Sequence, residues 1–151
     1  MIIKADMKDF YKVKRITQTA IKEIYPRYYP EGAVEFFLSH HSDSSIVGDI
    51  GSGCVFLCLD EWGDAVGTVT VRENEILRLF VLPKHQGKGL GRELLDFAEQ
   101  TVAAEHEEAV IDASLPAKGI YLKRGYKETG YNIIPAGEDF LCYDVMKKKL
   151  R

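Results

Sequence analysis

The stretch Leu79-Phe-Val-Leu-Pro-Lys-His-Gln-Gly-Lys-Gly-Leu-Gly-Arg92 carries the strongest structural signal in this chain. An apolar run ends at Leu82, Pro83 interrupts it, and three alternating glycines precede a helical pattern. Glycine lets the backbone approach a ligand in conformations barred to other residues. Free amides at a helix start carry a partial positive charge that attracts phosphate. The stretch therefore predicts a phosphate-bearing ligand, and a glycine-rich surface turn without a ligand is the alternative.

Two well-known phosphate motifs fit this stretch poorly. A Walker A loop requires Gly-x4-Gly-Lys-Ser/Thr, and neither the spacing nor the final hydroxyl is present. A dinucleotide fingerprint requires Gly-x-Gly-x-x-Gly, but Arg92 stands where its third glycine belongs. Asp112 could imitate the ribose-binding acid of that motif. However, the segment Leu82-Pro-Lys-His-Gln86 separates the strand from Gly87, whereas the dinucleotide motif has its first glycine directly at the strand end.

The periodicity of the remaining sequence predicts a mixed α+β (α/β) fold. Alternating or continuous apolar runs predict strands over residues 2–5, 53–59, 65–72, 75–82, 109–113 and 140–146. Apolar residues three and four apart predict helices over residues 9–24, 31–39, 90–104 and 117–124. Residues 40–52 are polar and are expected to form a loop. This order indicates a mostly antiparallel central sheet flanked by helices, with the later strands joined by helical crossovers.

Length and composition indicate one domain over residues 1–151. The chain is 46% apolar and 28% charged, and a chain of this length can bury a single sizeable core. Its longest apolar run, Cys54-Val-Phe-Leu-Cys-Leu59, is far shorter than the roughly 20 residues of a membrane span. The first residues show no pattern of a secretory signal. We therefore expect a cytoplasmic protein without a membrane partner.

The charge of this chain disfavours nucleic acid as a general partner. The net charge is −3, and the first 146 residues hold 16 basic against 23 acidic side chains. Binding to nucleic acid draws most of its affinity from Lys and Arg on the phosphates. The basic end, Lys147-Lys-Lys-Leu-Arg151, is expected to be a solvated strand end. Cys54, Cys58 and Cys142 have no zinc-like spacing, so no metal site is predicted from them.

Two segments resemble signature motifs of one enzyme family. Gln86-x-x-Gly89-x-Gly91 resembles the Gln/Arg-x-x-Gly-x-Gly/Ala signature of the GNAT superfamily of N-acetyltransferases. Downstream, Ala117-Lys-Gly-Ile-Tyr-Leu-Lys-Arg-Gly-Tyr126 is similar to the family's Ala-x-x-(Tyr)-x-x-x-Gly-Phe/Tyr segment. One position departs from the pattern, because Ser114 stands where the family often has Asn. The resemblance covers about residues 53–126, and the expected element order agrees with the family fold.

The resemblance implies a GNAT-like fold, acetyl-CoA as co-substrate and a set of site residues. Tyr121 matches the tyrosine that protonates the leaving thiolate, and Glu75 resembles the position of a general-base glutamate. A bulge near residues 79–81 would free the amides of Phe80 and Val81 for the pantetheine and the developing oxyanion. The residues expected to bind the cofactor are Leu79, Phe80, Val81, Gln86, Gly87, Lys88, Gly89, Leu90, Gly91, Arg92 and Ser114.

Each chemical role has a structural alternative. Tyr121 could be a core aromatic residue, and Glu75 a solvated hairpin carboxylate beside Glu73, with water serving as the base. A cysteine nucleophile has no support, because no histidine neighbours the cysteines in the sequence. His40-His41 followed by Asp43 could be drawn as a metal site, although an exposed helix end is the favoured interpretation.

The predicted activity is transfer of an acetyl group from acetyl-CoA directly to a primary amine of a small molecule or peptide, through a ternary complex. Tyr25-Pro-Arg-Tyr-Tyr-Pro30 could recognise an acceptor with a carboxylate or aromatic group, or could be a rigid connector packed on the sheet. A non-catalytic acyl-CoA sensor and a toxin-like acetyltransferase of aminoacyl-tRNA are the alternatives. A homodimer is conceivable for a fold whose last strand is exposed.

Overall fold

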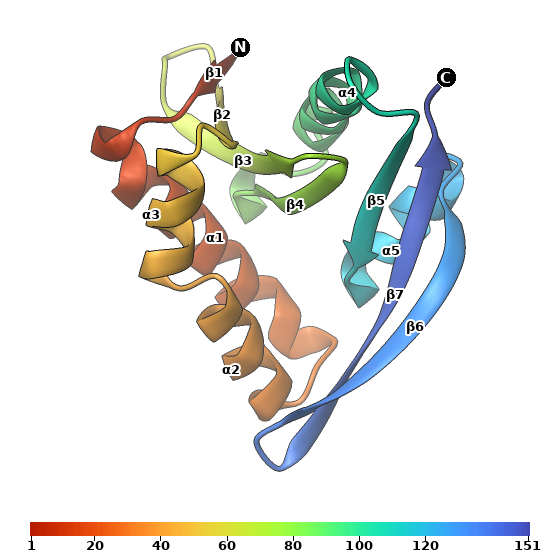
Figure 1. Ribbon diagram of the computed structural model, residues 1–151. Coiled ribbons are helices and arrows are strands. Elements are labelled where there is room, and N and C mark those ends of the chain that lie inside the picture. Colours follow the sequence, from red (N-terminus) through yellow and green to blue (C-terminus); the bar gives the residue numbers. More distant parts are fainter.

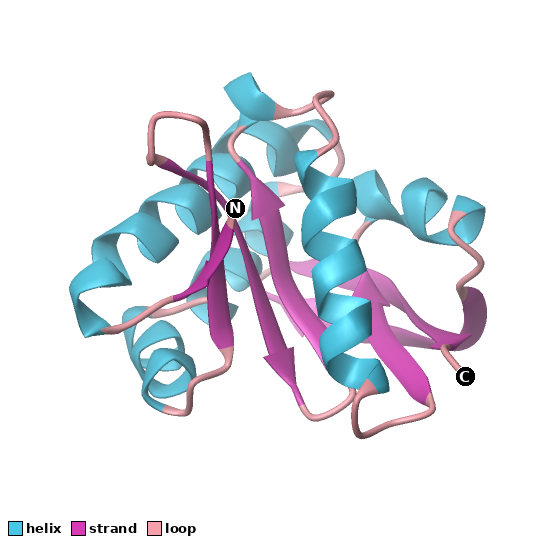
Figure 2. Cartoon of the chain, turned by 90° about the horizontal axis from the view of Figure 1, so that it is seen from above, coloured by secondary structure: helices cyan, strands magenta, loops and turns pink.

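Seven strands form one twisted sheet, and helices cover both of its faces (Figure 1, Figure 2). The computed structural model describes all residues, 1–151. The strands are β1 (Ile2–Lys4), β2 (Val55–Leu59), β3 (Ala65–Arg72), β4 (Glu75–Val81), β5 (Glu108–Ala113), β6 (Lys127–Ala136) and β7 (Asp139–Lys149). The helices are α1 (Phe10–Ile24), α2 (Glu31–His40), α3 (Asp43–Gly51), α4 (Leu90–Ala103) and α5 (Leu115–Lys123). Short 3-10 turns are η1 (Met7–Asp9), η2 (Tyr25–Arg27) and η3 (Pro83–His85).

The strand order β1-β2-β3-β4-β5-β7-β6 is antiparallel except at one place. There β4 and β5 run parallel and pair at a single position, Glu75 with Val110. Beyond that pair the two strands diverge, and Figure 1 shows them separating toward the carboxyl end of β4. The predicted mixed, mostly antiparallel sheet flanked by helices is confirmed, and the divergence opens its centre.

Two apolar cores lie on opposite faces of the sheet. On one face, α1 presents a buried stripe at three- and four-residue spacing, made by Val13, Ile16, Ala20 and Ile21. On the other face, Leu94, Ala98 and Val102 of α4 form the same kind of stripe against β3, β4 and β5. These amphipathic patterns place both helices as the sequence predicts. None of the helices combines the length and the apolar character needed to cross a lipid bilayer.

The predicted loop over residues 40–52 is wrong, because most of it forms α3. The hydroxyl of Ser42 accepts the N–H of Ser45 at 3.3 Å and caps the helix. Ile46 and Ile50, four residues apart, are buried against the α1 side of the sheet. Serine, aspartate and glycine dominate the segment, and they favour turns in isolation. Capping and burial of the two isoleucines outweigh that preference.

The sequence pattern does not predict β6, and it predicts only residues 140–146 of β7. Most residues of β6 are exposed, so the strand lacks the alternation by which strands are recognised. β7 continues to Lys149 and lies between β5 and β6. The expectation of an exposed last strand is therefore wrong, since β6 and not β7 is the edge strand on this side of the sheet. Within the basic end, Lys148 is not simply solvated, because its ammonium contacts Glu99 at 3.2 Å.

Candidate functional site

A bulge in β4 shapes the centre of the site. Gly67 and Thr68 pair with Val81 and Phe80, whereas Thr70 pairs with Leu77, so two residues of β4 lie opposite the single residue Val69. The two residues are Arg78 and Leu79, and Arg78 has a φ of 47°. The bulge therefore begins one residue before the predicted segment 79–81. It bends the strand away from β5, which a bulge commonly does.

The backbone of Val81 faces the opening between β4 and β5. Leu82 donates its N–H to the carbonyl of Val66 in β3 at 2.8 Å. Because peptide groups alternate in direction along an antiparallel strand, the amide of Val81 points away from β3 and that of Phe80 points toward it. The Gln86 side chain donates to the carbonyl of Val81 at 3.1 Å on the open side. Of the two amides expected to be free, only that of Val81 faces the opening.

The glycine-rich loop requires glycine for its backbone conformation. Gly87 and Gly89 have φ values of 77° and 85°, in the left-handed region that other residues avoid. A Cβ built on either one would meet nothing within 4 Å, so both glycines border open space. Gly89 is also the N-cap of α4 and provides no side-chain cap. The first amides of α4 are therefore available to a ligand.

A cleft of about 850 Å³ joins the loop, β4 and α5. It is lined by most of the residues expected to bind the cofactor or act in catalysis, namely Leu79, Phe80, Val81, Gln86, Gly87, Gly89, Gly91, Arg92, Ser114 and Tyr121. Lys88 and Leu90 belong to the same loop and helix start but do not line the cleft. Most of the predicted cofactor residues are thus brought together at one opening.

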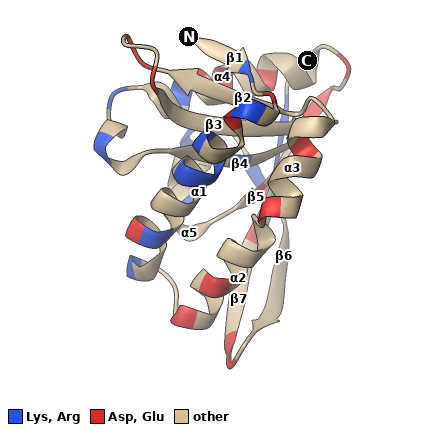
Figure 3. Ribbon diagram, turned by 90° about the vertical axis from the view of Figure 1, so that its left-hand side faces the viewer, with Lys and Arg blue, Asp and Glu red and all other residues tan.

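The cleft is cationic although the chain is acidic. Its charged lining residues are Arg27, Arg92, Lys123 and Arg124, and no Asp or Glu lines it. Arg27, Arg92 and Lys123 form no ion pair within the chain, whereas Arg124 is paired with Asp96 and Glu99. Acidic residues lie instead along α2 and α3 and at the tip of the β6–β7 hairpin (Figure 3). The cleft therefore suits an anionic ligand.

Tyr121 lies in the wall of the cleft, and its side chain is also packed. The residue is 6% exposed, and its ring centroid is 5.7 Å from that of Tyr126. Burial, with a smaller effect of Tyr25, raises the pKa of the Tyr121 hydroxyl. The hydroxyl thus keeps its proton at neutral pH. Tyr121 is therefore a core aromatic residue that also lines the cleft.

Glu75 lies apart from this cleft. It opens β4, is exposed, and pairs in register with Arg72 of β3 and Val110 of β5. It is not among the residues that line the cleft. The structure does not bring Glu75 and Tyr121 to the same cavity, so direct contact between Glu75 and an acceptor there has no geometric support. The solvated carboxylate is the description that fits its surroundings.

The tyrosine-rich connector after α1 is partly packed in the core and partly exposed to the cleft. Tyr25 and Tyr29 are buried in the core, and burial raises the pKa of Tyr25 to about 12. Arg27 and the half-exposed Tyr28 line the cleft beside Tyr25. The connector is therefore a packed element and a cleft wall at once. Further lining residues were not predicted from the sequence. Ala20 and Ile24 belong to no motif, and Ile120 and Lys123 stand at variable positions of the second motif.

The remaining candidate groups lie outside the cleft. None of the three free cysteines lines it, and Cys58 is fully buried. His40 is exposed at the end of α2, in line with the expected helix end. His41 is half-buried, and its Nδ1 accepts a hydrogen bond from Arg78 Nε at 3.3 Å. Burial and the charge of Arg78 lower the pKa of His41 to about 3.

The fold is shared with solved acetyltransferase structures. A GCN5-related N-acetyltransferase from Rhodopseudomonas palustris superposes with a TM-score of 0.89 at 21% identity, covering 99% of this chain and 94% of that one. The PaiA N-acetyltransferase from Thermoplasma acidophilum, in complex with coenzyme A, gives 0.77 at 20% identity over 99% and 98% of the chains. The protein yncA from Salmonella typhimurium, solved with its cofactor acetyl-CoA, gives 0.69 at 17% identity over 100% and 94%.

The sequence itself matches a family model. The model of the acetyltransferase (GNAT) domain aligns with residues 24–149, which include the glycine-rich loop, Tyr121 and the diverging strands β4 and β5. The match extends well beyond the two motifs recognised in the sequence. This chain belongs to the GNAT family of acetyltransferases.

Proposed function

We propose that this protein transfers the acetyl group of acetyl-CoA directly to a primary amine of a small molecule or peptide, within a ternary complex. The observation that carries the proposal is the cationic cleft at the divergence of β4 and β5, with the Val81 amide and the Tyr121 side chain in its walls. All three cysteines are free, which fits a reducing, cytoplasmic setting.

The residues of the cleft fit acetyl-CoA chemically. The amides of the loop from Gly87 to Gly91 and the start of α4 would hold the pyrophosphate, with Arg92 adding positive charge. Ser114, the N-cap of α5, makes no cap hydrogen bond of its own and lines the cleft. It would supply the polar contact that the family often takes from Asn. Two of the related structures contain coenzyme A or acetyl-CoA, which supports this fit.

Acetyl-CoA supplies a thioester, and the chain supplies hydrogen-bond donors to its two reacting ends. The Val81 N–H, which faces the opening, would donate to the carbonyl oxygen, where negative charge develops as the amine attacks. Tyr121, protonated at neutral pH, would give its proton to the departing thiolate. The packed ring of Tyr121 holds the hydroxyl in place without further reorganisation.

The acceptor amine must lose a proton before or during attack. Ordinary alkylamines have a pKa near 10.4, so most of the acceptor is protonated at neutral pH. Because Glu75 does not line the cleft, we propose that water carries this proton out, with Glu75 at most its final acceptor in solvent. Replacing Glu75 with Gln should leave kcat within about twofold across the pH range. A tenfold loss would instead assign Glu75 a direct role.

The acceptor site is proposed to lie at the connector after α1. Arg27 has no acidic partner within the chain, and Tyr28 is half exposed beside it. A guanidinium next to an aromatic ring suits an amine that also bears a carboxylate or an aromatic group. This placement separates the two substrates, since the glycine loop takes the phosphates and the connector takes the acceptor.

A ligand test comes before the kinetic one. Acetyl-CoA at 100 times its Kd should raise the free energy of unfolding by about 2.7 kcal/mol, and NAD should not. Thiol release should then be measured over a panel of amines with and without a carboxylate. Stabilisation by NAD alone would overturn the proposal. Stabilisation by acetyl-CoA without turnover on any amine would favour the non-catalytic sensor, and turnover confined to aminoacyl-tRNA would favour the toxin-like enzyme.

A further inference from the structure

A buried arginine lies at the β4 bulge. Arg78 is 6% exposed, and its guanidinium is on the α3 side of the sheet, away from the glycine-rich loop. Its φ of 47° is unfavourable for a residue with a side chain. Burial of a guanidinium also costs free energy unless the group is paired and hydrogen-bonded. Contacts of the guanidinium with neighbouring side chains must therefore offset both the strain and the cost of burial.

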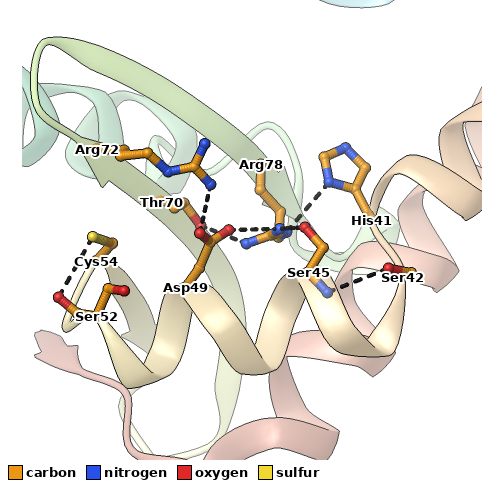
Figure 4. Close-up of polar contacts among 9 residues, drawn as sticks. All are labelled: His41, Ser42, Ser45, Asp49, Ser52, Cys54, Thr70, Arg72 and Arg78. Carbon is orange, nitrogen blue, oxygen red and sulfur yellow. Dashed lines mark hydrogen bonds and ion pairs between the residues drawn. The ribbon is translucent and has the colours of Figure 1, made fainter.

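Four side chains accept hydrogen bonds from Arg78 (Figure 4). Nη2 contacts Asp49 Oδ2 at 3.0 Å and Ser45 Oγ at 3.2 Å, both on α3. Nη1 donates to Thr70 Oγ1 of β3 at 2.9 Å, and Nε donates to Nδ1 of His41 at 3.3 Å. The guanidinium thus ties β4 to the neighbouring strand and to two segments of the helical layer. We refer to Arg78, Asp49, Thr70, Ser45 and His41 as the arginine clamp.

The bulge decides which amide of β4 faces the opening. A one-residue change of register in a strand reverses the direction of every following peptide group and side chain. Without the extra residue at the bulge, the Val81 amide would point toward β3, and Leu82 would lose its bond to Val66. The anchoring of Arg78 on α3 opposes that slip, since a regular strand would draw the guanidinium away from Asp49.

We propose that Arg78 is a positioning residue, which through its ion pair with Asp49 holds the β4 bulge and thereby aims the Val81 amide at the thioester carbonyl. This inference rests on the proposed acetyl transfer. Arg78 itself does not line the cleft, so it acts on the reaction only through the backbone of β4.

His41 gives the clamp a second connection to the cleft. Because arginine can only donate, Nδ1 of His41 is the acceptor, and in the neutral ring the proton is on Nε2. The ring meets that of Phe80 edge to face, with centroids 5.6 Å apart, and Phe80 lines the cleft. The clamp therefore fixes both the backbone of the bulge and the side chain that follows it.

The first experiment measures amide hydrogen exchange in β4, which reports on the bulge independently of catalysis. In the free wild-type protein, amide hydrogen exchange should show protection at Leu82, which is bonded to Val66, and none at Val81. The double variant Arg78→Met with Asp49→Asn removes both charges together, so that neither is left buried and unpaired. In this variant we expect protection at Leu82 to fall at least tenfold while the amides of β2 and α4 keep theirs.

Kinetics and binding provide the second readout. The double variant should lose at least about tenfold in kcat while its Kd for coenzyme A stays within about twofold, because the glycine-rich loop is untouched. Arg78→Lys, which keeps the charge, should recover part of the loss. Lys14→Met is the matched control, since Lys14 pairs with Asp43 of α3 at 2.9 Å outside the clamp, and it should change neither exchange at Leu82 nor kcat.

Each outcome decides the proposal. Unchanged exchange at Leu82 in the double variant would overturn the role of the clamp whatever happens to kcat. A parallel fall of protection throughout the chain in both the double variant and Arg78→Lys would also overturn it, because Arg78 would then be a stability residue only. If wild-type protein transfers no acetyl group, the proposed function fails, but the exchange result still shows whether Arg78 holds the bulge.

Discussion

The hydroxyl oxygen of Tyr29 accepts the backbone N–H of Leu115 at 2.6 Å, a hydrogen bond that spans 86 positions of sequence. Tyr29 belongs to the connector after α1, and Leu115 is the first residue of α5. Both segments contribute walls to the cleft, on either side of the opening between β4 and β5. This bond therefore sets the separation of the two walls at the carboxyl ends of those strands.

Replacing Tyr29 with Phe should loosen that connection. The first N–H of α5 would lose its acceptor, at a cost of about 1 kcal/mol in the free energy of unfolding. Urea unfolding measures this cost, and titration with acetyl-CoA should show weaker binding, because α5 also carries Pro116 and Ala117 of the cleft wall. Tyr28→Phe is the control, since Tyr28 is half exposed and should change stability little. Equal stability losses in the two variants would contradict this account.

Tyr121→Phe tests the proposed proton donor. The variant keeps the packed ring against Tyr126 and removes only the hydroxyl. We expect kcat to fall by about tenfold to a thousandfold, with the Kd for acetyl-CoA and the thermal midpoint nearly unchanged. Steady-state thiol release together with calorimetry measures both. Unchanged turnover would remove Tyr121 from the chemistry and leave it as a core aromatic residue.

Gly89→Ala tests the loop, and the chain provides a matched control. Gly89 and Gly63 have nearly the same φ, 85° and 86°, and a Cβ on either one meets nothing within 4 Å. Both alanine variants should lose about 1–2 kcal/mol of stability from left-handed strain. Only Gly89→Ala should weaken acetyl-CoA binding, by tenfold or more, because only Gly89 borders the cleft. Equal acetyl-CoA affinity in both variants would show that the loop does not bind the phosphates.

The parts of the site that could be predicted from sequence depend on local rules. Spacing alone identified the glycines at 87, 89 and 91, which precede a helical pattern. Spacing also identified Tyr121, which lies within its motif. The structure gathers them at one cleft because β4, α4 and α5 adjoin the same opening in the sheet. Glu75 shows the limit of this reasoning, since its place in a strand says nothing about the cavity that its side chain faces.

What could not be predicted depends on tertiary contacts. Residues 43–51 become helical because Ile46 and Ile50 find a core against α1, and no local signal outweighs their polar neighbours. Arg78 is indistinguishable in the sequence from an outward-facing strand residue. Only the bulge sends it inward to Asp49, 29 positions away. β6 is an exposed edge strand, and its solvated residues carry no periodic pattern.

The pH dependence of stability tests the packing behind Tyr121. The carboxylate of Glu99 accepts hydrogen bonds from Arg124 Nε at 2.8 Å, from Tyr126 at 2.9 Å and from Lys148 at 3.2 Å. Burial alone would raise its pKa, but these donors lower the pKa below the usual 4.5. A lowered native pKa means that the stabilising contribution is present above pH 4.5 and is lost as the pH falls through the native value.

Glu99→Gln should therefore cost stability at pH 7, and the difference from wild type should shrink as the pH is lowered from 4.5 toward 3. Urea unfolding at pH 7, 5, 4 and 3 measures this difference. The control is Glu93→Gln, because Glu93 pairs with the N-terminal amine at 3.4 Å with both groups exposed, so its effect should be small at every pH. A difference for Glu99→Gln that stays constant down to pH 3 would show that its charge does not stabilise the contact between α4, α5 and β7.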